Sequence, residues 1–413
     1  MTTHELCAAA KAASRAMLAA TTAQRNAALG AIASALRKNA GGILEANAKD
    51  VEAARKAGMR DSLLDRLSLD TRRVSQIADG VADVAAQSDP VGRVLSVVTR
   101  PNGLEIARRT VPLGVVAMIY EARPNVTVDA AALCLKAGNA VVLRGGKEAF
   151  HSNRAFAELM REAIAAEGLP ADAVSFVTDT SRGSVDELMN ATGLIDLLIP
   201  RGGAGLIAHV TQNARVPVVE TGVGNCHVYA ERSADLDMAA EIIYNAKCSR
   251  PSVCNAAETL LVDREIAAEF LPKAYALLAE AGTEIRGCPE TLVILPQAVP
   301  ATEADWETEF GDYILAVRVV SGYDEAAAHI AKYSSGHSEC IVTNDYALSR
   351  RFADETDAAA VYVNASTRFT DGGEFGLGAE IGISTQKLHA RGPMGAEQLT
   401  SVKYVILGSG QVR

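Results

Sequence analysis

The sequence lacks the features that mark membrane, secreted and nucleic-acid-binding proteins. No apolar run reaches the ~18 residues that a membrane span needs, and the N-terminal segment MTTHELCAAAKAASRAM has no basic head followed by an apolar block. The net charge is −10 and no basic stripe is present, which argues against a nucleic-acid partner. Seven cysteines without a CxxC pair, and seven scattered histidines, favour a reducing compartment and no structural zinc site. We therefore expect a soluble cytoplasmic protein that holds no metal and binds neither nucleic acid nor membrane.

The length and the residue pattern predict more than one domain. A chain of 413 residues is too long for one ordinary core. Residues 1 to about 90 are rich in Ala, Leu, Arg and Glu, with helix-start signals at Thr22 and Asp70, and predict a helical layer. Residues 93–110 alternate in polarity on both sides of Pro101-Asn102-Gly103, which predicts a hairpin.

From residue 113 onward, short β-rich runs alternate with helical stretches. Strands are expected at LGVVAMIY, AVVLRGG, VSFVTD, IDLLIPRGG and VPVVETGVG. Helices are expected at 126–137, 149–167, 184–192 and 204–214, the third with a capping box from Ser184 to Glu187. This alternation predicts a parallel sheet that is covered on both faces and binds ligands at the carboxyl ends of its strands.

A second alternating series predicts a second α/β domain. Its strands are expected at ETLLVD, TLVILP, ILAVRVVS, SECIVT and AAVYVNAS, and its helices at 235–247, 265–281, 324–332 and 346–355. The remaining residues, 366–413, are rich in Gly and end in the strand-like SVKYVILG. That strand and the 93–110 hairpin are expected to be exposed edges that pair with a partner subunit.

The segment KCSRPSVCNA, residues 247–256, places two cysteines beside Lys247 and Arg250, whose charges favour a reactive thiolate. Cys248 ends a predicted helix, where the dipole disfavours negative charge. Cys254 follows a Pro-Ser turn before a buried strand, and a nucleophile and a buried structural cysteine are equally good interpretations of it. Inert core positions are expected for Cys134, Cys226 and Cys340, and peripheral ones for Cys7 and Cys288.

Glycine and basic residues follow two of the predicted strands. Arg144 and Lys147, in LRGGKE, could hold a phosphate or form a solvated basic loop. Gly202 and Gly203, in RGGAG, resemble a phosphate-binding turn but lack the full GxGxxG spacing, so a tight strand-to-helix turn is the stronger interpretation.

Three further polar residues have both a functional and an ordinary interpretation. Glu220, at a predicted strand end, suits a general base or a cap of the next turn. His337 lies in the polar loop of YSSGHSECI and is expected at the surface. Asn125, in EARPNV, is explained by N-capping of a helix.

Motifs spread over nearly the whole chain carry a family resemblance. Four of them are LCLKAGNAVVLRGG, VVETGVGNCHVY, PSVCNAAETLLV and ETEFGDYILAVRVV. In this order they resemble the adenosine-binding, glutamate-glycine, catalytic-cysteine and Glu-Phe-Gly segments of the aldehyde dehydrogenase superfamily. Three others, YEARPNVTVDAAALCLKAGNA, KCSRPSVCNA and YDEAAAHIAKYSSGHSECIVTND, resemble the branch of that superfamily that reduces γ-glutamyl phosphate.

The resemblance implies an α/β fold with two doubly wound parallel-sheet domains and a small β oligomerisation flap. The implied limits are 1–92 and 111–230 for an NADP-binding domain, 231–365 for a catalytic domain, 93–110 and 395–413 for the flap, and 366–394 for a segment that returns to the cofactor domain. The resemblance also implies a homo-oligomer, and contact with glutamate 5-kinase, which supplies the substrate.

By the same resemblance, Cys254 is the nucleophile, Asn125 donates to the oxyanion, and Glu309 holds the nicotinamide ribose of NADPH. The implied reaction converts γ-glutamyl 5-phosphate to glutamate 5-semialdehyde and phosphate through a thioester, as the second step of proline biosynthesis from glutamate. Other cofactor contacts are expected from Arg144, Lys147, Gly202, Gly203 and Glu220. The substrate candidates, chosen because they lie near predicted strand ends, are Arg123, His337 and Arg368.

The chain departs from the oxidising members of the superfamily at two places. Their cofactor loop has Lys-Pro where this chain has Arg144-Gly145, and an acid where it has Lys147, a change that favours the 2′-phosphate of NADP. Glu220 matches their water-activating base, but acyl phosphate reduction has no hydrolysis step. The rival interpretations are a hydrolysing NAD(P)-dependent aldehyde dehydrogenase that makes a free acid, and a non-catalytic binding protein. The joint presence of Cys254, Asn125 and Glu309 argues against the binding protein.

Overall fold

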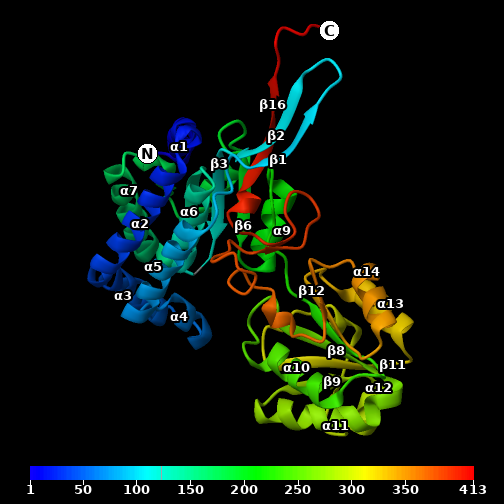
Figure 1. Cartoon of the computed structure of the whole chain (residues 1–413). Helices are drawn as coiled ribbons and strands as arrows, with labels where there is room; N and C mark the ends of the chain where they lie inside the picture. Colours follow the sequence, from blue (N-terminus) through cyan, green and yellow to red (C-terminus); the bar gives the residue numbers. More distant parts are fainter. Residues whose placement is uncertain (122) are drawn as a thin grey trace. The chain divides into compact units, whose positions relative to one another are not determined.

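The computed structural model describes residues 1–121 and 123–413, which form two compact units (Figure 1). Unit 1 comprises residues 1–221, 376–382 and 388–413, and unit 2 comprises residues 222–375 and 383–387. Each unit has its own parallel sheet. In the described part of the chain, no helix is long and apolar enough to cross a membrane.

The N-terminal part of unit 1 is helical, as predicted. Its helices are α1 (Thr3–Ala19), α2 (Thr22–Lys38), α3 (Ala40–Lys56), α4 (Asp61–Leu67) and α5 (Thr71–Ala86). Capping boxes begin α1 and α2, and the Asp70 side chain accepts from the backbone N–H of Arg73 at the start of α5. These caps satisfy backbone donors that the first helical turn leaves unpaired, so the predicted helix starts at Thr22 and Asp70 are confirmed to within a residue.

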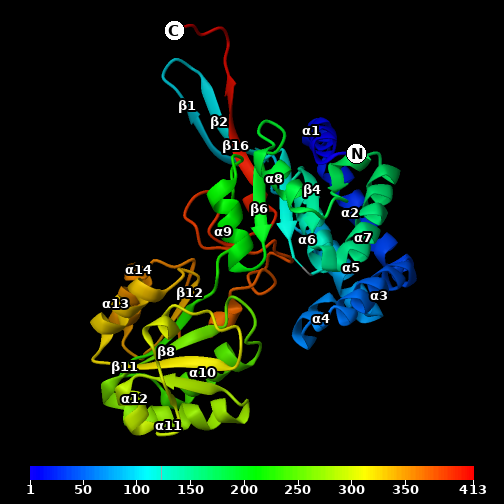
Figure 2. The same ribbon diagram turned by 180° about the vertical axis from the view of Figure 1, so that it is seen from behind.

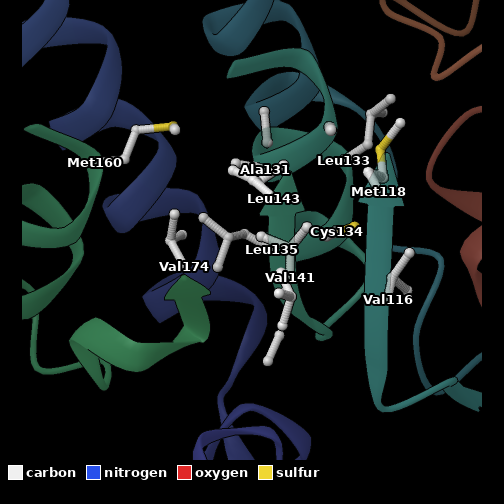
Figure 3. Packing of buried hydrophobic residues seen from close by; sticks show 14 of the residues in the cluster. Val116, Met118, Ala131, Leu133, Cys134, Leu135, Val141, Leu143, Met160 and Val174 are labelled. Carbon is white, nitrogen blue, oxygen red and sulfur yellow. The ribbon is translucent and has the colours of Figure 1, made fainter. Parts of the chain in front are cut away.

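The sheet of unit 1 contains four parallel strands in the order β5-β4-β3-β6. They are β3 (Val115–Tyr120), β4 (Ala140–Gly145), β5 (Val174–Phe176) and β6 (Leu197–Arg201), linked by α6 (Asn125–Lys136), α7 (Phe150–Ala166) and α8 (Arg182–Asn190), with α9 (Ala204–Asn213) after β6. Every residue of β3 is buried, as expected for a strand that is covered on both faces. Figure 3 shows Val116 and Met118 of β3 packed near Val141 and Leu143 of β4, with Cys134 of α6 in the same apolar cluster.

Two details of the predicted pattern in unit 1 are wrong. Helix α8 begins at Arg182, and the hydroxyl of Ser184 donates to the backbone carbonyls of Asp179 and Ser181, so Ser184 does not start a capping box. The run VPVVETGVG does not form a full strand; it contributes one isolated bridge, between Leu198 and Val218. Local propensity favoured a strand there, but the chain leaves the sheet after this bridge.

Unit 2 contains a parallel sheet of seven strands in the order β10-β9-β11-β8-β7-β12-β13. The strands are β7 (Cys226–Ala230), β8 (Ala257–Asp263), β9 (Glu284–Gly287), β10 (Val299–Pro300), β11 (Ile314–Val320), β12 (Ser338–Val342) and β13 (Ala360–Val363). The helices are α10 (Leu236–Cys248), α11 (Arg264–Glu280), α12 (Pro289–Ile294), α13 (Tyr323–Tyr333) and α14 (Tyr346–Glu355).

Helices cover both faces of this sheet (Figure 2). Successive side chains of a strand point to opposite faces, so each strand packs against helices on both sides. Leu260 and Val262 of β8 pack in one cluster with Phe270 of α11, whereas Leu261 packs in another with Phe352 of α14. The predicted doubly wound α/β architecture is confirmed. The run TLVILP, predicted as a strand, lies instead mostly in α12, which begins with Pro289. A short apolar run suits either structure, and proline at the first helical position decides for the helix.

The predicted hairpin and the C-terminal strand are confirmed and form one three-stranded antiparallel sheet. Strands β1 (Val94–Thr99) and β2 (Glu105–Pro112) pair with each other, and β16 (Thr400–Leu407) pairs with β2 along its length (Figure 1). Much of the apolar surface of this sheet is exposed to solvent; the residues concerned are Val94, Leu95, Val97, Val98, Val402, Tyr404, Ile406 and Leu407.

Candidate active site

The loop between α10 and β8 places Cys254 just before the amino end of β8. Its side chain is partly exposed. A Cβ on Gly224 would lie 1.5 Å from the carbonyl oxygen of Cys254, so only glycine permits this approach of the two backbones. The thiol of Cys226 donates to the same carbonyl at 3.2 Å. The backbone of Cys254 is therefore held from the side of β7.

Four other cysteines, Cys248, Cys340, Cys134 and Cys7, have environments that suppress a thiolate. Cys248 is buried, its sulfur lies 3.4 Å from Oγ1 of Thr283, and burial raises its pKa. Burial likewise raises the pKa of Cys340 to about 12 and that of Cys134 further. Cys7 is fully buried in unit 1, where burial raises its pKa to about 11, so the prediction of a peripheral position is wrong.

Lys247 forms a buried ion pair with Glu258. The ammonium lies 2.5 Å from Oε2 of Glu258, and both side chains are 0% exposed. Burial lowers the pKa of Lys247 and raises the pKa of Glu258 to about 7, while their mutual attraction opposes both shifts. Lys247 was expected to assist a cysteine thiolate, but most of its charge is balanced by Glu258. The acidic residue at the start of the predicted strand ETLLVD is the sequence signal from which this ion pair could have been predicted.

The ion pair also supports the loop that carries Glu309. The N–H of Gly311 donates to Oε1 of Glu258 at 3.1 Å, and the ammonium of Lys247 lies 6.0 Å from the ring centroid of Phe310. Glu309 in turn accepts the N–H of Gly224 at 3.0 Å. Although the residue is exposed as a whole, desolvation of its carboxyl group raises the pKa of Glu309, against the effects of the Gly224 amide and of Lys247. Contacts thus link Glu258, the Glu309 loop and the backbone of Cys254.

Arg368 is a cation that interacts electrostatically with Cys254 and donates a hydrogen bond to the next residue, Asn255. Burial and the charge of Arg250 lower the pKa of Arg368, and the charges of Asp371 and Cys254 raise it. Its Nε donates to Oγ of Ser249 at 3.1 Å, and its Nη1 donates to Oδ1 of Asn255. The substrate candidate Arg368 therefore contacts the residue that follows Cys254.

His337 is buried, contrary to the surface position expected for it. Its Nδ1 lies 2.8 Å from Oγ of Ser338 and 3.8 Å from the sulfur of Cys226. Burial lowers the pKa of His337 to about 4, so the imidazole is neutral near pH 7. With 0% exposure the ring cannot touch a substrate in this conformation, so any effect of His337 on a substrate passes through its neighbours.

In unit 1, the glycine loop after β6 meets an acidic residue from the end of β3. The N–H of Gly203 donates to Oε2 of Glu121 at 2.9 Å, and a Cβ on Gly202 would lie 2.6 Å from the carboxyl carbon of that residue. Gly202 thus permits the close approach of Glu121 to the start of α9. Glu121 was not predicted as a site residue, although it follows directly on a predicted strand.

The two basic residues after β4 have different environments. Arg144 is half-buried, and its Nη2 donates to the backbone carbonyls of Thr180 and Ser181 at 2.8 and 2.9 Å. Lys147 is exposed and begins a short 3₁₀ turn, Lys147–Ala149. Of the two, Lys147 is therefore the more available for an anion.

Asn125 is the first residue of α6, but it is not the cap that the sequence predicted. Pro124 occupies the N-cap position, and the amide of Asn125 donates to Oδ2 of Asp129 at 2.9 Å. Burial raises the pKa of Asp129 to about 6, while the bond from Asn125 and the charge of Arg201 act against that rise. Arg123 and Glu220 are both partly exposed.

The predicted site residues fall into two groups. In unit 2, Glu309 and Arg368 interact with residues around the Cys254 loop. His337 is buried next to Cys226. Those of unit 1 lie on the loops that follow β3, β4 and β6 or precede unit 2; they are Arg123, Asn125, Arg144, Lys147, Gly202, Gly203 and Glu220. Within the described residues, no group of His, Cys, Asp and Glu has an arrangement that could hold a metal ion.

Comparison with known proteins identifies the class. The family model of the aldehyde dehydrogenase family matches residues 1–285, and the chain belongs to this family of oxidoreductases. The fold alone is also shared with an acetylating aldehyde dehydrogenase from Geobacillus thermoglucosidasius, at 20% identity and a TM-score of 0.74 over 100% of this chain and 97% of the other.

Within the family, the chain groups with the γ-glutamyl phosphate reductases. It is 61% identical to that of Carboxydothermus hydrogenoformans, over 98% of this chain and 97% of the relative. It is 57% identical to that of Moorella thermoacetica, with the same coverage. The crystal structure of the γ-glutamyl phosphate reductase of Thermotoga maritima matches with a TM-score of 0.98 and 50% identity over 100% of both chains.

Proposed function

We propose that this chain reduces γ-glutamyl 5-phosphate to glutamate 5-semialdehyde and phosphate, with NADPH as the hydride donor. The reaction is the second step of proline biosynthesis from glutamate, and we place it in the cytoplasm. The observation that carries the proposal is the setting of Cys254, a partly exposed thiol on a loop held by Gly224 and close to the charge of Arg368. The names and coverage of the relatives support the substrate.

Cys254 is the nucleophile in this mechanism. Its thiolate sulfur bonds to the acyl carbon, the bond from that carbon to the phosphate oxygen breaks, and phosphate leaves with the electron pair. Asn125 and the backbone N–H of Cys254 donate to the oxyanion. NADPH, when bound, supplies a hydride to the thioester carbon. The electron pair of the carbon–sulfur bond then returns to Cys254 and the aldehyde is released, with one proton taken up overall.

The loops of unit 1 suit the phosphates of NADPH. The start of α9 offers the positive end of a helix dipole and backbone N–H groups, of which that of Gly203 donates to Glu121 in this structure. Lys147 is exposed, and no carboxylate of the described residues pairs with it, so its charge is available for the 2′-phosphate. Glu309, which accepts the N–H of Gly224, is the proposed partner of the nicotinamide ribose.

A second copy of the chain is the proposed cover of the sheet formed by β1, β2 and β16. Its exposed apolar side chains are unfavourable in water for a monomer, and its edge strand has unpaired backbone groups. Deletion of residues 400–413 should then give a monomer or an aggregate in light scattering, and an unchanged particle size would contradict this part of the proposal. Contact with glutamate 5-kinase stays a prediction.

The test of the reaction is its phosphate requirement. In the oxidative direction, with glutamate 5-semialdehyde and NADP, phosphate accepts the acyl group from Cys254. Turnover should therefore require phosphate, and its product should regenerate NADP when NADPH is added. Turnover at full rate without phosphate would identify a hydrolysing aldehyde dehydrogenase instead.

A further inference from the structure

Two arginine side chains bring positive charge to the Cys254 loop. The guanidinium of Arg368 spans the loop, because it donates to Ser249, the neighbour of Arg250, and to Asn255, the neighbour of Cys254. Among the described residues, no carboxylate lies within ion-pair distance of Arg250 or Arg368. Two like charges are thus held close together without a direct ion pair, and Asp371 is the acid whose charge acts on Arg368 from a greater distance.

The position of Arg368 is fixed by neutral groups. The hydroxyl of Thr367 donates to the carbonyl of Asn255 at 2.7 Å, and the amide of Asn255 donates to the carbonyl of Thr370 at 3.0 Å. Asn255 is only 3% exposed. This clamp orients the guanidinium without neutralising it, which is the arrangement that binding of an external anion needs.

The local backbone cannot supply the same charge. Helix α10 ends at Cys248, so the loop begins at the negative end of a helix dipole. Any anion bound beside Cys254 must be stabilised by side chains, and Arg250 and Arg368 are the cations that flank the loop.

We propose that Arg250 and Arg368 form an anion subsite that binds the phosphoryl group of an acyl phosphate while Cys254 attacks the acyl carbon. The inference rests on the proposed function. The phosphoryl oxygen is bonded to the carbon that the sulfur attacks, whereas the α-carboxylate is at the far end of the substrate. Negative charge builds up on the phosphate as the carbon–oxygen bond breaks, so two guanidiniums stabilise the departing group more than the bound substrate.

Protection of Cys254 from iodoacetamide measures the subsite without turnover. Inorganic phosphate should slow alkylation of Cys254 in the wild type, and the phosphate concentration for half-protection should rise at least about tenfold in Arg368→Gln and in Arg250→Gln. Half-protection is compared rather than the alkylation rate, because loss of a cation also changes the thiol pKa. Arg250 is exposed, so its variant tests the subsite even where Arg368→Gln fails to fold. Arg350→Gln, an exposed arginine on α14, is the matched control and should protect like the wild type.

Steady-state kinetics in the oxidative direction distinguish phosphate from the carboxylate. In Arg250→Gln, the KM for phosphate should rise while the KM for glutamate 5-semialdehyde stays within about twofold of the wild type. A rise in the KM for the aldehyde alone would overturn the proposal, because the arginines would then bind the α-carboxylate. Absence of phosphate protection in the wild type would also overturn it, even if reduction is confirmed. Protection without any turnover of the semialdehyde would instead refute the proposed function and retain the anion subsite.

Discussion

The two parallel sheets carry their candidate site residues at opposite ends of their strands. In unit 1, the glycines and basic residues follow the carboxyl ends of β4 and β6, where α9 begins. In unit 2, the loops with Cys254 and Glu309 precede the amino ends of β8 and β11. Helices begin at carboxyl ends and finish at amino ends, so unit 1 offers positive helix dipoles and unit 2 offers negative ones.

This difference explains why unit 2 depends on ionisable side chains. A site at helix N-termini binds anions through backbone N–H groups, as the start of α9 can. A site at helix C-termini needs side-chain cations, and unit 2 has Arg250 and Arg368 beside the end of α10, whereas Lys247 is paired with Glu258. Such groups make reactivity adjustable, but buried charges reduce stability when they lose a partner. Unit 1 is therefore expected to be the more tolerant to substitution at its site.

The largest effect is expected from Cys254→Ala. Because the thiolate provides the covalent route through the thioester, reduction should fall at least about a thousandfold, while the fold and NADPH binding are retained. Cys248→Ala should lose far less, since the sulfur of Cys248 is buried against Thr283. The measurement is NADPH consumption with γ-glutamyl phosphate, combined with circular dichroism. Activity of Cys254→Ala within tenfold of the wild type would refute the assignment.

The second prediction concerns the buried pair of Lys247 and Glu258. Lys247→Met or Glu258→Gln alone leaves one buried group unpaired and should lower the free energy of unfolding by about 3–5 kcal/mol. The double variant Lys247→Met/Glu258→Leu should recover most of that loss, yet still impair activity, because Gly311 loses its acceptor. Urea denaturation measures the first effect and the KM for NADPH the second. Glu290→Gln, in an exposed pair with Arg264, is the control. Equal stability of single and double variants would contradict the prediction.

The third prediction tests the binding loop of unit 1. Arg144→Gln/Lys147→Gln should raise the KM for NADPH by about ten- to a hundredfold, and that for NADH much less, since each charge-assisted hydrogen bond to the 2′-phosphate contributes roughly 1.5–3 kcal/mol. Lys147→Gln alone should account for most of the change, because Arg144 already donates to Thr180 and Ser181. Lys38→Gln, an exposed lysine on α2, is the control. Equal weakening of both cofactors would show that the loop contacts another part of the ligand.

Most of the fold could be predicted from the sequence, because continuous apolar strands and amphipathic helices differ in length and period. The failure at TLVILP has a local cause, since a run of this length suits both structures. The environment of the site residues was harder to predict from the sequence. The clamp on Arg368 joins Asn255 to residues more than 100 positions later in the chain, and no local pattern encodes such a contact. The burial of His337 likewise depends on packing between β7 and β12, not on its polar neighbours in the sequence.

The fourth prediction uses the buried histidines of unit 2. Burial lowers the pKa of His337 to about 4 and that of His329 to about 3, from 6.5. Below pH 6.5 the unfolded chain therefore binds protons that the folded chain does not, so stability falls as the pH drops toward 4. The loss should approach about 1.4 kcal/mol per pH unit for each histidine. Urea denaturation from pH 7 to 4 should show a smaller slope for His329→Gln than for the wild type, whereas His209→Gln, an exposed histidine of unit 1, should keep the slope. An unchanged slope in His329→Gln would contradict the assignment.

The smallest effect is expected from Glu220→Gln, which tests whether water takes part in the reaction. In a hydrolysing aldehyde dehydrogenase, a carboxylate at this position activates water, and its loss stalls the acyl-enzyme. In acyl phosphate reduction the acyl group comes from phosphate and the thioester is reduced, so no water attacks. Glu220→Gln should therefore slow reduction by about tenfold or less. Removal of a negative charge should also lower the alkylation pKa of Cys254. Single-turnover kinetics with NADPH and an iodoacetamide pH profile measure the two quantities. A loss of more than about a thousandfold with an unchanged thiol pKa would mean that Glu220 transfers a proton in the reaction itself.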